Sequence, residues 1–218
     1  HYPPYLYLIT CMSETASTPM RIALFGTSAD PPHWGHYEIL QWLSRHYDHV
    51  AVWASDNPYK AHQSTLGDRA AMLQLMIHEI AAAAGTLALH TELSHSRSLV
   101  SAQRARAHWP TAALTLVVGS DLVPQLPRWY QAAELFQLVQ ILIIPRPRYD
   151  LSDDDLQAIR RHGGQAAIAD IPETFDISSS HYRRTDDPDA LPAAVKTYID
   201  QHHLYPCTES SKEKQPIS

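Results

Sequence analysis

The chain has 218 residues, a formal net charge of −6 at pH 7 and a pI near 6.1. This length suits one α/β domain with a sizeable core. The acidic balance argues against a nucleic-acid-binding surface as the main function. The longest apolar run, around Val139 to Ile144, has the length of a strand and is too short to span a membrane.

Short apolar runs alternate with longer amphipathic stretches along the chain. The expected strands are Arg21–Phe25, Val50–Ala54, Thr86–His90, Leu114–Val118, Val139–Ile144 and Ala166–Ile168. The expected helices are His36–Tyr47, Gly67–Ala84, Ser98–His108, Tyr130–Phe136, Ser152–His162, Ser179–Arg184 and Pro192–Gln201. Strands separated by helices predict an α/β fold with a parallel sheet and helices on both faces. Ligands of such sheets bind at the carboxyl ends of the strands.

The two ends of the chain are expected to lie outside this fold. Residues 1–19 are interpreted as a non-core or disordered extension that lacks the basic start of a signal peptide, with translation starting at Met12 or Met20. Residues 207–218 are polar and are predicted to be a disordered tail. Residues 20–206 then form a single domain.

Cysteines and histidines supply no metal or disulfide pattern. Cys11 and Cys207 lie near opposite ends of the chain, so a reducing, cytoplasmic location is expected. Most of the 14 histidines, including His162 and the pair His202–His203, are interpreted as surface residues.

The segment from Gly26 to His36 carries the first functional signal. A glycine turn at Gly26 and Thr27, after a buried strand, lets backbone N–H groups approach a phosphate. His33 and His36 flank Gly35 at the head of a helix, one turn apart on the same face. Their imidazoles can donate to phosphate oxygens, and in cationic form they would stabilise transition-state charge. The pattern predicts an oligophosphate site for phosphoryl or nucleotidyl transfer; a capping or packing role is the alternative.

Candidate nucleotide ligands follow the fourth strand. Asp121 can accept hydrogen bonds from ribose hydroxyls, and Gly119 permits close approach, although Gly-Ser-Asp is also an ordinary turn. In Leu126-Pro127-Arg128-Trp129-Tyr130, the face of Trp129 can stack on a planar or positively charged ring, or the tryptophan can belong to the core.

Two further segments offer anion-binding groups. Ile177-Ser178-Ser179-Ser180-His181-Tyr182-Arg183 places three hydroxyls at a helix start and an arginine one turn later. Helix amides, serines and arginine together suit ATP phosphates, although a serine cap beside a solvated arginine would explain part of the cluster. Lys60 follows the second strand, where it can either contact a phosphate or remain solvated.

In order and spacing, these motifs resemble those of bacterial nicotinate-nucleotide adenylyltransferases, from about Met20 to Tyr205. The H-x-G-H signature is that of the nucleotidylyltransferase superfamily, whose fold is a Rossmann-like, doubly wound parallel sheet; a related sequence occurs in class I aminoacyl-tRNA synthetases. The matching segments are Gly26–His36, Gly119–Asp121, Leu126–Tyr130, Arg146–Tyr149 and Ile177–Arg183. The resemblance implies transfer of AMP from ATP to a pyridine mononucleotide in NAD biosynthesis, with Mg²⁺ and release of pyrophosphate.

The resemblance also implies residue roles. Catalysis would fall to His33, His36 and Arg183. ATP would be bound by Gly26, Thr27, Gly35, Gly119, Asp121, Ser178, Ser179 and Arg183, and the pyridine mononucleotide by Lys60, Ser98, Trp129 and Tyr130. No metal-ligating residue is implied, because ATP oxygens and water would hold most of the Mg²⁺. No nucleic acid or membrane is expected as a partner, and a homo-oligomer is left open.

One segment departs from the family pattern. Where the family usually reads S-Y-T-x-D-T-L, next to the pyridine substituent, this chain has Ser96 to Ala102, with Arg97 for the tyrosine and Val100 for the acid. The choice between nicotinate and nicotinamide mononucleotide is therefore open. Arg97 beside a carboxylate would favour the nicotinate form, which we predict, although a solvated arginine is the alternative.

Three other functions share part of these signals. A sister adenylyltransferase acting on phosphopantetheine shares the first motif but would not need Trp129 or the Ser178–Arg183 segment in this form. A synthetase-like or tRNA-modifying enzyme would want a basic surface and an anticodon- or zinc-binding appendage. A non-catalytic nucleotide sensor would be expected to lose one of the paired histidines.

Overall fold

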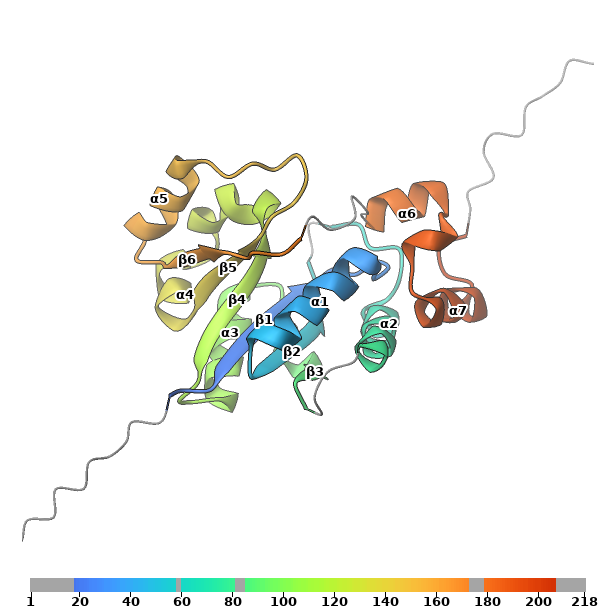
Figure 1. Cartoon of the computed structure of the whole chain (residues 1–218), viewed down its shortest axis with the longest axis horizontal. Helices are drawn as coiled ribbons and strands as arrows, with labels where there is room; N and C mark the ends of the chain where they lie inside the picture. Colours follow the sequence, from blue (N-terminus) through green and yellow to red (C-terminus); the bar gives the residue numbers. More distant parts are fainter. Residues whose placement is uncertain (1–17, 58–59, 81–84, 173–178, 207–218) are drawn as a thin grey trace, which may run out of the picture.

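The computed structural model describes residues 18–57, 60–80, 85–172 and 179–206. A six-stranded, wholly parallel sheet runs through the middle, in the order β3-β2-β1-β4-β5-β6 (Figure 1). The strands are β1 Arg21–Thr27, β2 His49–Ala54, β3 Leu87–Leu89, β4 Ala113–Gly119, β5 Gln140–Ile144 and β6 Ala166–Ile168. The order reverses between β1 and β4, so the chain winds outward in both directions from the middle of the sheet.

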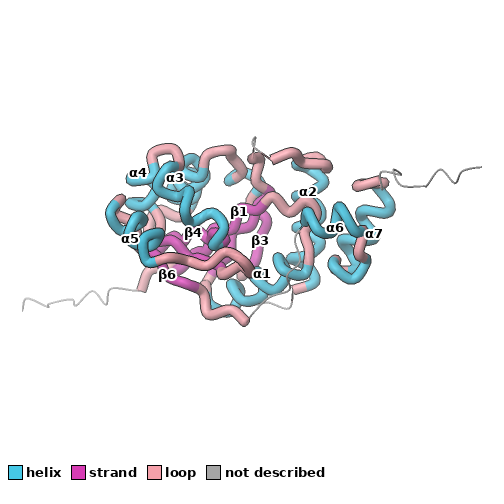
Figure 2. The backbone as a smooth tube through the Cα atoms, turned by 90° about the horizontal axis from the view of Figure 1, so that it is seen from above, coloured by secondary structure: helices cyan, strands magenta, loops and turns pink. Residues whose placement is uncertain are grey.

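Helices cover both faces of this sheet. They are α1 Trp34–His46, α2 Leu66–Glu79, α3 Ser98–His108, α4 Ala132–Leu138, α5 Asp153–Arg161, α6 Ser179–Thr185 and α7 Ala193–His202. Short 3₁₀ segments, η1 Thr91–Leu93, η2 Ser120–Arg128 and η3 Pro188–Ala190, lie between them. Figures 1 and 2 both place α6 and α7 beside α2. No helix in the described ranges has the length and apolar character needed to cross a bilayer.

The core forms because side chains alternate across each strand. In β1, Ala23 and Phe25 face one side, where they pack with α1, α2 and α7. Ile22 and Leu24 face the other side, which α3, α4 and α5 cover. The predicted single-domain α/β fold with helices on both faces is therefore confirmed.

The element order is as predicted, and β6 and α3 have the predicted bounds. The helix expected from Tyr130 begins at Ala132, because Gln131 takes a left-handed conformation with φ of 48°. The helix predicted to run from Gly67 to Ala84 is wrong at its end, because α2 stops at Glu79 and Ile80 takes an extended conformation with ψ of 119°. Residues 81–84 and the terminal segments 1–17 and 207–218 lie outside the described residues.

The prediction of a glycine turn at Gly26 is wrong. Strand β1 continues through Gly26 and Thr27, which pair with Trp53 and Ala54 of β2. A Cβ on Gly26 would lie 2.5 Å from the Trp53 ring. The glycine is therefore required by the packing of a neighbouring indole within the sheet.

Candidate active site

The paired histidines lie where β1 gives way to α1. His33 is the N-cap of α1, and its Nδ1 accepts a hydrogen bond from Gly35 N at 3.1 Å. His36 Nδ1 accepts from His33 N at 3.2 Å, which completes a reciprocal cap. The two ring centroids are 4.0 Å apart. The capping role that was an alternative to ligand binding is therefore real, but it uses only Nδ1.

These caps fix the tautomer of each ring. Because each Nδ1 accepts a backbone N–H, a neutral imidazole must carry its proton on Nε2. His36 Nε2 lies 3.0 Å from Thr27 Oγ1 and donates to it. The His33 Nε2–H has no hydrogen-bond acceptor among the described residues. It is therefore a hydrogen-bond donor available to a ligand at the carboxyl end of β1.

Both rings are buried, with His33 7% and His36 5% exposed. Burial, assisted by the charge of Arg146, lowers the pKa of His33 to about 3. Burial also holds the pKa of His36 well below its ordinary value, with further lowering from His33, Arg146 and Lys60. Both rings are therefore neutral Nε2–H donors in this structure, and the cationic form that would stabilise transition-state charge stays a prediction.

Asp30, which the sequence did not single out, anchors the loop in front of His33. Its carboxylate is 2% exposed. It accepts hydrogen bonds from Gln63 N, from the Ser64 backbone and hydroxyl, and from the Tyr205 hydroxyl at 2.6 Å. Burial acts to raise the pKa of Asp30, but the hydrogen bonds from Ser64 and Tyr205 outweigh it and lower the pKa. The carboxylate is therefore ionised and ties three distant segments together.

Helix α6 docks on this same loop. The Arg183 guanidinium donates to Asp30 O and lies 3.9 Å from the Asp30 carboxylate. Ser179 Oγ donates to Pro31 O at 2.8 Å. The predicted meeting of Ser179 and Arg183 with the histidine loop is present in the structure, while Ser178 lies outside the described residues. Whether these groups hold phosphates stays a prediction.

Lys60 reaches the same space from the loop after β2. Lys60 keeps an exposed surface, but partial desolvation lowers its pKa. The negative charge of Asp121 acts to raise this pKa, and the positive charges of Arg146 and Arg183 act to lower it. Its charge also acts on His36. Lys60 therefore adds positive charge to the site, as a phosphate ligand would.

Gly119 and Asp121 lie at the end of β4 and the start of η2. Asp121 Oδ1 forms an ion pair with Arg146 Nε at 3.1 Å. A Cβ on Gly119 would lie 2.5 Å from the same Nε atom. Arg146 belongs to a segment that matched the family, but it was not a candidate ligand.

The candidate pyridine ligands cluster around the start of α3. Trp129 ends η2 and packs partly against the core under α3, α4 and α5. Tyr130 is 49% exposed, and the Arg97 guanidinium carbon lies 4.0 Å from its ring centroid. Ser98 follows Arg97 as the first residue of α3. The residue that departs from the family pattern therefore sits on a predicted substrate-binding ring.

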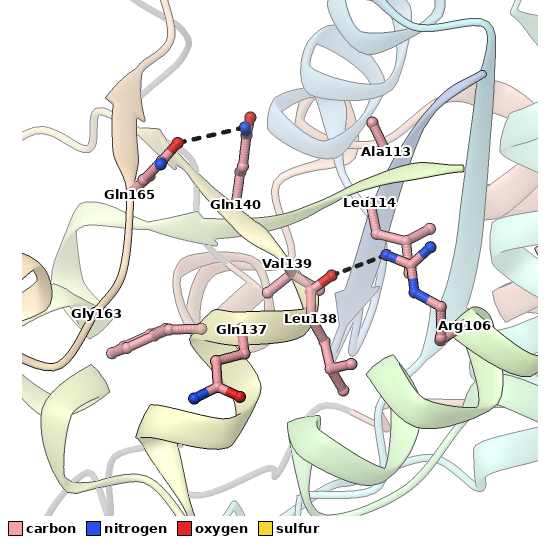
Figure 3. Close-up of a pocket in the computed structure, with 10 residues that line it drawn as sticks. Arg106, Ala113, Leu114, Gln137, Leu138, Val139, Gln140, Gly163 and Gln165 are labelled. Atoms are coloured by element: carbon pink, nitrogen blue, oxygen red, sulfur yellow. Dashed lines mark hydrogen bonds between the residues drawn. The ribbon is translucent and has the colours of Figure 1, made fainter. Parts of the chain in front are cut away.

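A separate cavity of about 240 Å³ lies at the opposite, amino-terminal edge of the sheet (Figure 3). It is lined by the starts of β4 and β5 and by Arg106. The Arg106 guanidinium donates to the carbonyls of Ala112 and Leu138, so it braces the backbone. Because α/β sheets bind ligands at their carboxyl edge, we do not assign the nucleotide site to this cavity.

The sequence model of the cytidylyltransferase-like family matches residues 24–185, a range that includes both histidines and Arg183. A Synechocystis sp. protein named "Probable nicotinate-nucleotide adenylyltransferase" is 44% identical over 198 residues, covering 85% of this chain and 99% of that protein. The chain belongs to the nicotinate-nucleotide adenylyltransferase family. The Bacillus subtilis nicotinate-nucleotide adenylyltransferase is 25% identical over 195 residues, with 85% of this chain and 98% of that protein covered.

Solved structures share the fold. Two structures of Plasmodium falciparum nicotinic acid mononucleotide adenylyltransferase, complexed with APC and with NaAD, superpose with TM-scores of 0.72 and 0.73. They are 19% and 18% identical and cover 85% of this chain and 97% of theirs. This likeness confirms the Rossmann-like architecture that the motifs implied.

Proposed function

We propose that this family member transfers AMP from ATP to nicotinate mononucleotide, giving deamido-NAD and pyrophosphate in NAD biosynthesis. One observation carries the proposal beyond membership of the family. His33 and His36 each accept a backbone N–H at Nδ1, so each carries its proton on Nε2. The His36 Nε2–H is donated to Thr27 Oγ1, and the His33 Nε2–H has no acceptor among the described residues. That arrangement suits binding of phosphate oxygens, because it supplies donors without a nucleophile or a general base.

In this proposal the mononucleotide phosphate oxygen attacks the α-phosphorus of ATP in line, and the bond to the β-phosphate oxygen breaks. His33 and His36 donate to the phosphates, and the negative charge of ATP raises the affinity of their rings for a proton. Arg183 and Lys60 compensate the charge that builds up on the leaving pyrophosphate. The loop that binds the triphosphate is shaped by Thr27, Gly35 and Ser179. The ribose hydroxyls donate to Asp121, and Gly119 permits their close approach.

Mg²⁺ is proposed to arrive with ATP. In the described parts of the chain, no group of three or more His, Cys, Asp or Glu side chains is arranged to hold a metal ion. The side chains expected around the triphosphate are imidazoles, hydroxyls, an arginine and a lysine, rather than the carboxylates that most often hold Mg²⁺ in proteins. ATP oxygens and water would therefore complete its coordination, and the ion would neutralise phosphate charge.

The nicotinate preference rests on Arg97. Its guanidinium is held on the ring of Tyr130, the residue that follows Trp129, the proposed stacking partner of the pyridine. A cation at this place would favour a pyridine carboxylate over a neutral amide. We also propose that the enzyme is cytoplasmic and that its binding partners are its two nucleotide substrates. Light scattering would test whether it associates with itself.

The deciding experiment is pyrophosphate release from ATP and Mg²⁺ with nicotinate mononucleotide, nicotinamide mononucleotide or phosphopantetheine as the acceptor. We expect release with nicotinate mononucleotide, a lower kcat/KM with the nicotinamide form, and none after chelation of Mg²⁺. Equal kcat/KM for the two pyridine nucleotides would refute the nicotinate preference. Release only with phosphopantetheine would move the chain to the sister activity, and no release from folded, ATP-binding protein would indicate a sensor.

A further inference from the structure

Arg146 and Asp121 meet above the ends of two neighbouring strands. Asp121 follows β4 and Arg146 follows β5, and Nε and Oδ1 are 3.1 Å apart. The Arg146 backbone is fixed as well, because its N–H donates to Ser120 Oγ at 2.9 Å. The ion pair thus closes across the carboxyl edge of the sheet, where the proposed function places ATP.

The guanidinium lies directly over the end of β4. A Cβ on Gly119 would be 2.5 Å from Arg146 Nε and 3.2 Å from Arg146 Cδ. Any side chain at Gly119 would therefore displace Arg146. The space beside Gly119 is filled by the Arg146 side chain and by Asp121 Oδ1, which are paired with each other.

Arg146 also reaches toward the opposite part of the site. Its positive charge contributes to the lowered pKa of His33, of His36 and of Lys60. It therefore lies within electrostatic range of three groups to which the proposed function assigns phosphate binding. A cation at this place repels the charge of Lys60 and disfavours protonation of the two imidazoles, and it would attract a triphosphate.

We propose that Arg146 exchanges partners when the nucleotide binds: it leaves Asp121 to the ribose hydroxyls and moves its guanidinium onto the triphosphate. This inference rests on the proposed function of the same site. The exchange gives up an ion pair but no hydrogen bond, because Asp121 Oδ1 is buried and makes no hydrogen bond within the described structure. Arg146 thereby links recognition of the nucleoside to recognition of the phosphates.

The exchange predicts opposite effects for ligands with and without phosphates. Adenosine must break the ion pair and offers Arg146 no new partner. ATP breaks the same pair but gives the guanidinium phosphate oxygens in return, a charge-assisted contact. Removing the charge of Arg146 should therefore leave adenosine binding unchanged or stronger while it weakens ATP binding.

The test is calorimetric titration of the full chain with adenosine and with ATP, using wild type, Arg146→Gln and Arg148→Gln. Arg148→Gln is the matched control, since it removes the same charge two positions away in the same segment. We expect Arg146→Gln to weaken ATP binding by about tenfold or more, the loss typical of one hydrogen bond between charged groups. Adenosine affinity should stay equal or rise, and Arg148→Gln should change both by less than about twofold.

Two results would overturn the inference. An equal loss of adenosine and ATP affinity in Arg146→Gln would mean that the arginine only supports the site. Unchanged ATP affinity would mean that the guanidinium does not reach the phosphates. Both measurements are independent of the acceptor, so a wild-type protein that binds ATP as expected but transfers no AMP would refute the proposed function and leave this inference standing.

Discussion

Two pairs of neighbouring histidines in this molecule use their Nδ1 atoms in opposite ways, one pair as hydrogen-bond acceptors and the other as donors. In the first pair, His33 and His36, each Nδ1 accepts a backbone N–H. In the second pair, His49 Nδ1 donates to Gly85 O and His90 Nδ1 donates to Glu92 Oε1, both at 2.7 Å. The first pair therefore holds its protons on Nε2 and the second holds them on Nδ1. Within the first pair His36 donates to Thr27 Oγ1, and His33 keeps the donor that has no acceptor among the described residues.

In the second pair the two Nε2 atoms therefore contact each other. They lie 3.0 Å apart and face each other. Each of the four ring nitrogens therefore has a partner within the protein. Two adjacent histidines thus make a ligand site only when their hydrogen bonds leave a donor facing outward.

Removing one ring from each pair should separate their roles most clearly. His36→Ala removes a proposed phosphate donor, so kcat for pyrophosphate release should fall by about 10²- to 10⁴-fold. His90→Ala should keep kcat within about threefold, because that ring lies outside the proposed site. Circular dichroism must show that both variants are folded. A fully active His36→Ala enzyme would contradict the proposed role of His36 as a phosphate donor.

Stability should respond the other way. His90→Ala leaves His49 Nε2 without its partner and removes the partner of Glu92, so urea denaturation should show a loss of about 1–3 kcal/mol in the free energy of unfolding. His33→Asn should cost less than about 1 kcal/mol, since asparagine also caps helices well, yet it should reduce turnover. If His33→Asn is as unstable as His90→Ala, the cap is not what the first ring contributes to the fold.

The pH dependence of stability sharpens the same contrast. The pKa of His33 is about 3 in the folded protein and near the ordinary 6.5 when unfolded. Between these two pH values His33 is protonated in the unfolded chain and neutral in the folded chain. The free energy of unfolding therefore falls as the pH drops below 6.5. The slope is up to about 1.4 kcal/mol per pH unit for this group. His33→Asn should give a shallower slope between pH 6 and 4; parallel curves would contradict the neutral, buried ring.

Periodicity made the fold predictable. Alternating residues such as Ile22 and Ala23 mark opposite faces of β1, and the expected helices follow in the observed order. The spacing of His33 and His36 at a helix start was sufficient to predict that they share one face. These features depend on residues that are neighbours in the chain, where local geometry decides.

The rest depends on contacts that the chain order does not reveal. The role of Gly26 is set by Trp53, which reaches it only through strand pairing. The ion pair of Arg146 with Asp121 needs β5 beside β4. The neutral state of the paired imidazoles follows from burial, which a motif cannot express.

The hydrogen bond between Tyr205 and Asp30 joins a late part of the chain to the loop in front of His33. All six strands have been made once the ribosome has passed Ile168, and both site histidines much earlier. Yet Asp30, three residues before His33, receives its phenol donor only from Tyr205, 175 residues later. A nascent or prematurely terminated chain can close its sheet with this anchor still missing. A chain shortened before Tyr205 would therefore hold the Asp30 carboxylate, and the loop in front of His33, with one hydrogen-bond donor fewer.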